Sequence, residues 1–177
     1  MKVKLFVFSS IFITNIAQAN ALNIQTIESN FNQSITNEQN AKVVYSGKMY
    51  ASQTKNQALW EYNSPISKKI YYKGSGKVVI IEPELEQVVY AKLDKIPNVL
   101  KLLESAKKTD DGRLKTKFNG INYYITANAN KIAKITYTDE MQNRVVIEFS
   151  NEKVNSFIDK SRFAYSVPAG YDILEQN

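Results

Sequence analysis

The chain has 177 residues, of which 44% are hydrophobic and 23% are charged, and its formal net charge is +6. This composition is typical of one ordinary globular domain and excludes a disordered or fibrous chain. The chain has no cysteine, which excludes disulfides, thiolate metal sites and a lipid-modified N-terminal cysteine. The densest basic pairs, Lys68-Lys69 and Lys107-Lys108, do not form the stripe with stacking aromatic residues that nucleic-acid binding needs. We therefore expect no nucleic-acid partner.

The first segment, residues 1–21, has the pattern of a secretory signal peptide. Two lysines precede an apolar run over Leu5–Ile16, and small residues follow in the A-x-A pattern up to Ala19 and again up to Ala21. The apolar run is too short to anchor a mature protein in a membrane. We predict cleavage after Ala19 or Ala21, export into solution, and a single domain over residues 22–177.

The mature chain would begin with a helix. In the segment 22–35, apolar residues recur at Ile24, Ile27, Phe31 and Ile35, with polar residues between them. Spacings of three and four residues place side chains on one face of an α-helix. We predict an amphipathic helix with one apolar stripe.

A period of two replaces the helical spacing from Lys42 onward, which predicts strands. The Gly74-Ser75-Gly76 sequence predicts a turn between two of them, and Pro83 ends the strand that follows this turn. We expect strands over residues 42–52, 58–62, 64–74, 77–82 and 87–91.

A second, shorter helix is predicted within residues 93–108. Asp94 can cap it and Pro97 suits its first turn. The apolar residues Ile96, Val99, Leu100 and Leu103 would share one face.

Strand alternation resumes after the polar link at residues 109–112 and continues almost to the end. We expect strands over residues 121–126, 131–138 and 143–150. The sequence has no linker, repeat or low-complexity stretch, so it predicts one antiparallel α+β domain.

Few residues offer catalytic chemistry. Without histidine and cysteine, the usual general base, the thiol nucleophile and most transition-metal sites are missing. Glu82, Glu84 and Glu86 lie at alternate positions, which is compatible with a carboxylate pair for glycoside hydrolysis or with a solvated turn around Pro83. We prefer the turn, and we expect no enzyme activity, no cofactor and no metal.

The strands instead align apolar and aromatic side chains. If the charged residue of each strand marks its outer face, then Lys48, Glu61 and Glu82 point outward. The inner face would then be apolar and concave over the whole sheet. The two helices either fill this concavity or leave room for a guest molecule, and periodicity alone favours the filled core.

Five stretches in a fixed order resemble the periplasmic outer-membrane lipoprotein carriers of the LolA family, and together they cover nearly the whole mature chain. They are FNQSI at 31–35, YSGKMY at 45–50, ALWEYNSP at 58–65, EPELEQV at 82–88 and FAYSVPAGYDIL at 163–174.

The resemblance implies an unclosed antiparallel β-barrel, a half-barrel, whose concave apolar face is covered by a helical lid and encloses a cavity for lipoprotein acyl chains. It also implies a periplasmic protein that receives acylated lipoproteins from an inner-membrane ABC transporter and delivers them to an outer-membrane receptor or to the outer membrane itself. We expect this protein to be a monomer. In this interpretation the first helix and residues 96–103 form the lid. The expected cavity and lid residues are Ile27, Phe31, Tyr45, Met49, Trp60, Tyr62, Val79, Ile81, Ile96, Val99, Leu100, Leu103, Tyr123, Ile135, Tyr137 and Ile147.

One position departs from the family pattern. Members often carry an arginine shortly before the tryptophan strand, where it hydrogen-bonds to the lid. Here residues 52–57 read SQTKNQ, without arginine. Lys55 either replaces this latch or is an exposed turn residue, and a lysine lacks the planar group that makes several fixed hydrogen bonds.

Three alternatives remain open from the sequence. The first is a carrier of another lipid or glycolipid with the same fold, because an apolar wall recognises methylene groups and not headgroups. The second is a secreted hydrolase that uses the carboxylates of Glu82 to Glu86. The third is a structural domain with a filled core.

Overall fold

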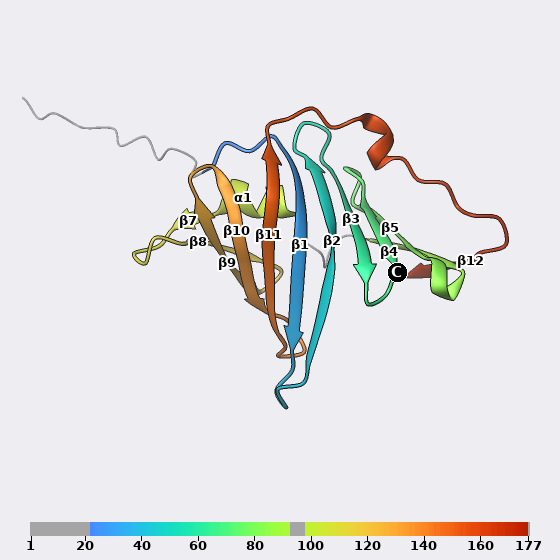
Figure 1. Cartoon of the computed structure of the whole chain (residues 1–177), viewed down its shortest axis with the longest axis horizontal. Coiled ribbons are helices and arrows are strands. Elements are labelled where there is room, and N and C mark those ends of the chain that lie inside the picture. The colour runs from blue at the N-terminus through green and yellow to red at the C-terminus, as the bar shows by residue number, and fades with distance from the viewer. Residues whose placement is uncertain (1–21, 93–97, 177) are drawn as a thin grey trace, which may run out of the picture.

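The computed structural model describes residues 22–92 and 98–176, which build one curved, unclosed sheet of 12 strands and a short helix (Figure 1). The strands are β1 Thr26–Thr36, β2 Lys42–Ser52, β3 Gln57–Ser64, β4 Lys68–Tyr72, β5 Lys77–Glu82, β6 Gln87–Lys92, β7 Lys107–Lys108, β8 Leu114–Phe118, β9 Ile121–Asn128, β10 Lys131–Thr138, β11 Arg144–Val154 and β12 Asp172–Gln176. The helix is α1, Val99–Ser105. The predicted signal peptide lies outside the described residues.

The strand order is β12-β6-β5-β4-β3-β2-β1-β11-β10-β9-β8-β7. Neighbouring strands are antiparallel, except that β12 pairs with β6 in parallel. The half-barrel prediction is therefore confirmed, with the difference that the sheet is mixed. Most strands occupy the predicted segments, whereas β7, β8 and β12 were not singled out from the sequence.

The first element is a strand, so the prediction of a helix over residues 22–35 was wrong. In β1 the buried residues alternate with less buried ones, and Ile27 and Phe31 lie on the concave side. A spacing of four residues is close to one helical turn and is also a multiple of two, so it fits both structures. Pairing with β2 and β11 along the whole length of β1 decides between them.

Two buried polar residues interrupt the apolar residues on the concave face of β1, so hydrophobicity alone does not show the alternation of a strand. Ser29 and Gln33 are both buried. The hydroxyl of Ser29 donates to the backbone carbonyl of Ser150 at 2.8 Å. The side-chain oxygen of Gln33 accepts from the Tyr62 hydroxyl at 2.9 Å. Both side chains therefore compensate the cost of leaving water.

The prediction that Val79 and Ile81 of β5 lie on the concave side was also wrong. Val78 and Ile80 face the cluster that contains Trp60, whereas Val79 and Ile81 belong to a separate cluster on the opposite face. Glu82 is the last residue of the strand, where its carboxylate accepts a hydrogen bond from Gln87 at 2.6 Å. Because it stands at the strand end, its charge does not mark the outer face.

The outer cluster consists of one face of β2 to β6 and the segment that follows β11. Its buried members are Tyr50, Leu59, Tyr71, Val79, Ile81, Val88, Ile158 and Phe163. Figure 1 shows this C-terminal segment passing the upper ends of β1, β2 and β3 before it returns to β12. The Lys73 ammonium donates to the carbonyl of Phe163, and the Arg162 guanidinium lies 5.0 Å from the centre of the Tyr50 ring. The segment therefore covers the second apolar face of β5.

Helix α1 occupies the concave side, where it crosses behind β10 and β11 in Figure 1. Its residues Val99, Leu100 and Leu102 are buried, and Leu103 is partly buried. Asn98 caps the helix, because its side-chain oxygen accepts from the Leu100 amide at 3.0 Å. The predicted second helix is thus confirmed in a shorter form, and Asp94, Ile96 and Pro97 lie outside the described residues. No helix in the described part of the chain is long and apolar enough to cross a membrane.

Candidate functional site

The centre of the concave face is an aromatic wall built by β1 and β3. The Phe31 ring meets Trp60 edge-on at a centroid distance of 4.8 Å and Tyr62 at 5.0 Å. Trp60 and Tyr62 stack at 6.4 Å. Such edge-to-face pairs stabilise beyond their buried area, so the wall is a rigid apolar surface.

Gly47 of β2 makes this wall possible. A Cβ atom at this position would lie 2.9 Å from the Phe31 ring and 1.9 Å from the backbone oxygen of Glu61. Only glycine lets the Phe31 ring and the backbone of β3 approach β2 so closely. The glycine of the YSGKMY stretch therefore has a packing role.

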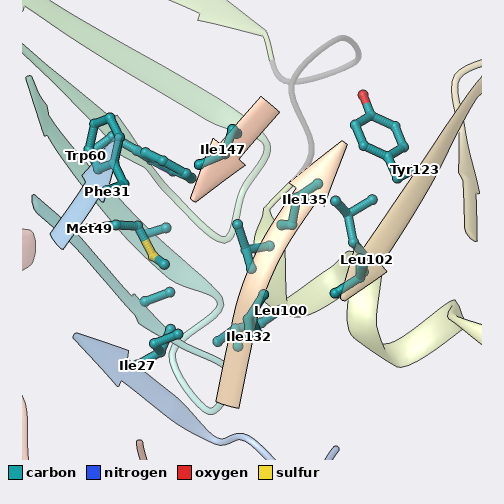
Figure 2. Close-up of a cluster of buried hydrophobic side chains, with 14 of the residues drawn as sticks. Ile27, Phe31, Met49, Trp60, Leu100, Leu102, Tyr123, Ile132, Ile135 and Ile147 are labelled. Atoms are coloured by element: carbon teal, nitrogen blue, oxygen red, sulfur yellow. The ribbon is translucent and has the colours of Figure 1, made fainter. Parts of the chain in front are cut away.

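Helix α1 fills one part of the concavity. Figure 2 shows Leu100 and Leu102 near Ile132 and Ile135 of β10, with Met49 on the opposite side. All of these residues belong to one buried cluster. Beneath the helix the structure is therefore a packed core, as periodicity favours.

A pocket remains beside this packed region. Its volume is about 340 Å³, within the range of about 300 to 1,000 Å³ that is usual for ligand sites. Its lining residues come from both arms of the curved sheet and from the β10–β11 turn: Gln33, Tyr62, Ile70, Tyr72, Ile121, Tyr123, Tyr137, Asp139, Glu140 and Met141. The concavity is thus filled in one part and hollow in another.

Tyrosines dominate the pocket lining, and burial keeps them protonated. Burial raises the pKa of Tyr62, Tyr72 and Tyr137 far above the ordinary value. Burial, together with the charge of Glu140, raises the pKa of Tyr123 to about 12. The hydroxyls are therefore neutral at physiological pH and can donate as well as accept hydrogen bonds.

The contact between the β2–β3 turn and α1 comes from Gln53. Its side-chain nitrogen donates to the carboxylate of Glu104 at 2.8 Å. At the same end of the helix, the hydroxyls of Ser105 and Thr116 lie 2.7 Å apart. Among the described residues, these side-chain hydrogen bonds tie α1 to the sheet.

Lys55 lies near the C-terminal segment. Hydrogen bonds from Ser161 lower the pKa of Asp159, and the positive charges of Lys55 and Arg162 lower it further. The role of Lys55 as a latch remains a prediction. Gln53 belongs to the same SQTKNQ stretch, but no sequence pattern predicted its contact with α1.

Most of the predicted cavity residues meet on the concave side. Buried in its cluster are Ile27, Phe31, Met49, Trp60, Val99, Leu100, Tyr123, Ile135 and Ile147, with Tyr62, Leu103 and Tyr137 partly buried against it. Tyr45 contacts Tyr62 edge-on at 5.8 Å. Val79 and Ile81 lie on the opposite face, and Ile96 is outside the described residues.

The pocket also contains residues that were not predicted from the sequence. Ile70 and Tyr72 alternate with Lys69 on β4, but Lys68 shares their face of the strand, so the charged residues of β4 did not indicate which face is concave. Gln33 carried no signal either, because a polar residue within an apparent helix is expected to face solvent.

The carboxylates between β5 and β6 lie on a turn, as preferred from the sequence. Residues Pro83–Leu85 form a single 3₁₀ turn. The carboxylate of Glu84 accepts a hydrogen bond from the Ser67 amide at 3.1 Å. Glu86 has a left-handed backbone with φ of 47°.

Comparison with known proteins agrees with this architecture. Residues 22–119 match the family model described as outer membrane lipoprotein carrier protein LolA. An outer-membrane lipoprotein carrier protein of Campylobacter jejuni is 37% identical over 171 residues, which is 97% of this chain and 98% of the relative. One from Helicobacter hepaticus is 33% identical over 170 residues, 96% of this chain and 93% of the relative.

Solved structures share the fold at low sequence identity. An uncharacterized conserved protein from Thermus thermophilus has a TM-score of 0.53 at 12% identity, covering 89% of this chain and 93% of its own. A LolA superfamily protein from Nitrosomonas europaea has a TM-score of 0.50 at 12% identity, covering 80% of this chain and 90% of its own. By sequence, this chain belongs to the LolA family of outer membrane lipoprotein carrier proteins.

Proposed function

We propose that this protein is a periplasmic chaperone that shields the acyl chains of lipoproteins while it carries them to the outer membrane. The observation that carries the proposal is the concave apolar face, which has one short helix as its described cover and a pocket of about 340 Å³ beside it. The printed names of the relatives support lipoproteins as the cargo.

The physical task is to offset the cost of exposing acyl chains to water. Each methylene group removed from water contributes about 0.8 kcal/mol, so one sixteen-carbon chain carries roughly 12 kcal/mol. An acylated protein therefore does not cross an aqueous compartment unaided. The aromatic wall, together with Met49 of β2, supplies apolar surface of the kind that is required.

Helix α1 is the lid in this proposal. Its leucines belong to the buried cluster of the concave side, so acyl chains and α1 compete for the same concave face. If only a small fraction of the carrier is open, its apparent affinity is the affinity of the open form multiplied by that fraction. This lower affinity helps release. Residues 26–36 cannot serve as a helical lid, because they form the strand β1 in the middle of the sheet.

The proposed loading and release steps follow from the direction of lipoprotein transport, from the inner membrane to the outer membrane. An inner-membrane ABC transporter would supply the energy for loading, and an outer-membrane receptor or the membrane itself would supply the tighter acceptor. The predicted signal peptide at residues 1–21 would place the protein between the two membranes. We propose that it works as a monomer.

The test uses spheroplasts that retain newly made lipoproteins on the inner membrane. Purified protein is added with ATP and a compatible transporter, the membranes are removed, and the supernatant is examined for a one-to-one complex with lipoprotein. Trp60→Glu should abolish release, and Ile121→Glu should reduce it strongly because this residue lines the pocket. Asn122→Glu adds the same charge one residue later, at an exposed position of β9, and should release normally.

Circular dichroism and thermal unfolding would verify that each variant is folded before release is scored. Failure of the wild-type protein to release any lipoprotein would refute the proposal. Mass spectrometry of co-purified lipid would then distinguish a carrier of another lipid from a domain with a filled core.

A further inference from the structure

Four tyrosines that come from opposite arms of the half-barrel line the pocket. Tyr62 and Tyr72 lie on β3 and β4, whereas Tyr123 and Tyr137 lie on β9 and β10. The rings of Tyr123 and Tyr137 are 4.7 Å apart. All four tyrosines line the same pocket, and burial raises the pKa of Tyr72 well above the ordinary value.

The tyrosine hydroxyls are not needed for a purely hydrocarbon ligand. Phenylalanine would give a similar apolar lining without the cost of removing a hydroxyl from water. In Figure 2 the Tyr123 hydroxyl points away from Leu102 and Ile135, so it is directed away from the packed core. The Tyr62 hydroxyl donates to Gln33, which fixes one side of the pocket.

The charges at the mouth of the pocket are of both signs. Asp139 and Glu140 are among the lining residues, and the ammonium of Lys68 lies 4.8 Å from the centre of the ring of Tyr62, another lining residue. The carboxylate of Asp139 already accepts hydrogen bonds from Asn143 and Met141. The mouth therefore does not select strongly for a cationic or an anionic headgroup, and the neutral hydroxyls remain as the polar feature of the pocket.

We infer that the hydroxyls of Tyr72, Tyr123 and Tyr137 bind the carbonyl oxygens of the ester or amide linkages that attach acyl chains to the cargo. This inference rests on the proposed function and names the chemical group recognised at the same site. The pocket holds the linkage, and the adjoining wall of Phe31 and Trp60 contacts the chains. A hydroxyl donates well to a carbonyl oxygen, and each such bond in a partly dry pocket adds a modest preference for acyl linkages over plain hydrocarbon.

The experiment compares two uncharged probes, methyl palmitate and an n-alkane of equal length, by displacement of a fluorescent hydrocarbon dye from the purified protein. Tyr72→Phe and Tyr137→Phe should each weaken methyl palmitate binding about fivefold, the effect of one net hydrogen bond. Alkane binding should not change. Tyr71→Phe is the matched control, because Tyr71 neighbours Tyr72 on β4 and faces the outer cluster.

The inference is overturned if the phenylalanine variants weaken both probes equally or neither of them. The lipoprotein carrier would survive that result, since both probes would still bind the wild-type protein. If the wild-type protein binds neither probe, the acyl-chain cavity itself is refuted and the proposed function falls with the inference.

Discussion

Gln53 and Glu104 connect the β2–β3 turn to helix α1, with the amide nitrogen of Gln53 donating to the carboxylate of Glu104 at 2.8 Å. The contact spans the edge of the concavity, so it couples the position of α1 to the sheet. Because it is exposed, its contribution lies at the low end for hydrogen bonds, about 0.5 kcal/mol.

Gln53→Ala should therefore loosen α1 and increase the open fraction. Apparent affinity for the fluorescent hydrocarbon dye should rise about twofold, because closure competes with binding. Hydrogen exchange of the Leu102 amide, which donates to the carbonyl of Asn98 at 3.1 Å, should become faster. Lys55→Ala is measured in the same two ways for comparison. If Lys55→Ala changes dye affinity and hydrogen exchange and Gln53→Ala does not, Lys55 is the latch and Gln53 is not.

Gly47→Ala should destabilise the protein by about 3 kcal/mol, the upper range for overpacked cores. The added Cβ would stand 1.9 Å from the Glu61 carbonyl oxygen, which belongs to the backbone and cannot swing aside. Urea unfolding should show a lower midpoint with an unchanged slope. Gly74→Ala, with its nearest atom at 3.3 Å, should cost less than about 1 kcal/mol; equal losses in both variants would contradict the tight packing at Gly47.

Phe163→Ala should destabilise the protein by about 3 kcal/mol, because this ring is 3% exposed and covers the outer cluster. Phe157→Ala removes the same atoms from a ring that is 88% exposed, and its effect should stay within about 0.5 kcal/mol. Chemical unfolding of both variants measures the difference. A destabilising Phe157→Ala together with a neutral Phe163→Ala would mean that the C-terminal segment does not cover the sheet as described.

Stability should fall at alkaline pH because of the pocket tyrosines. The unfolded chain ionises tyrosine near the ordinary pKa of 10.0, whereas the folded protein retains the proton on Tyr72 to higher pH because of burial. The folded pKa is raised, so its contribution to stability is complete below pH 10 and is lost as the pH rises through the folded value. For Tyr72 the loss approaches about 1.4 kcal/mol per pH unit within that window.

Denaturant unfolding at successive alkaline pH values measures this slope. Tyr72→Phe should flatten it, because phenylalanine cannot ionise. A slope that is the same in the variant and the wild type would show that Tyr72 ionises alike in the folded and unfolded states. Spectroscopic titration of tyrosinate in the folded protein would check the same point independently.

Strand phase could be predicted where a charged residue stands in the middle of a strand. Lys48 and Glu61 hold such positions in β2 and β3, and they correctly place Met49 and Trp60 on the concave side. The short helix was also predictable, because Val99, Leu100 and Leu103 lie at helical spacing next to polar residues. In these elements, a local pattern contains the information about which side is buried.

Elements that are covered by distant parts of the chain could not be assigned in this way. The four-residue spacing of Ile27 and Phe31 fits a helix and a strand equally, and only the ladders to β2 and β11 made β1 a strand. Tertiary contacts outweigh such a local preference because β1 forms backbone hydrogen bonds on both sides.

The sequence by itself determined where most of the strands and the short helix lie, and that the concave face is apolar. Tertiary structure decided which face of β5 is concave, because the C-terminal segment with Ile158 and Phe163 buries Val79 and Ile81 on the other side. It also decided where the pocket lies, since β3 and β4 meet β9 and β10 only across the curved sheet. A period of two reports burial only when one face is wet, so a strand buried on both faces needs the rest of the fold to assign its phase.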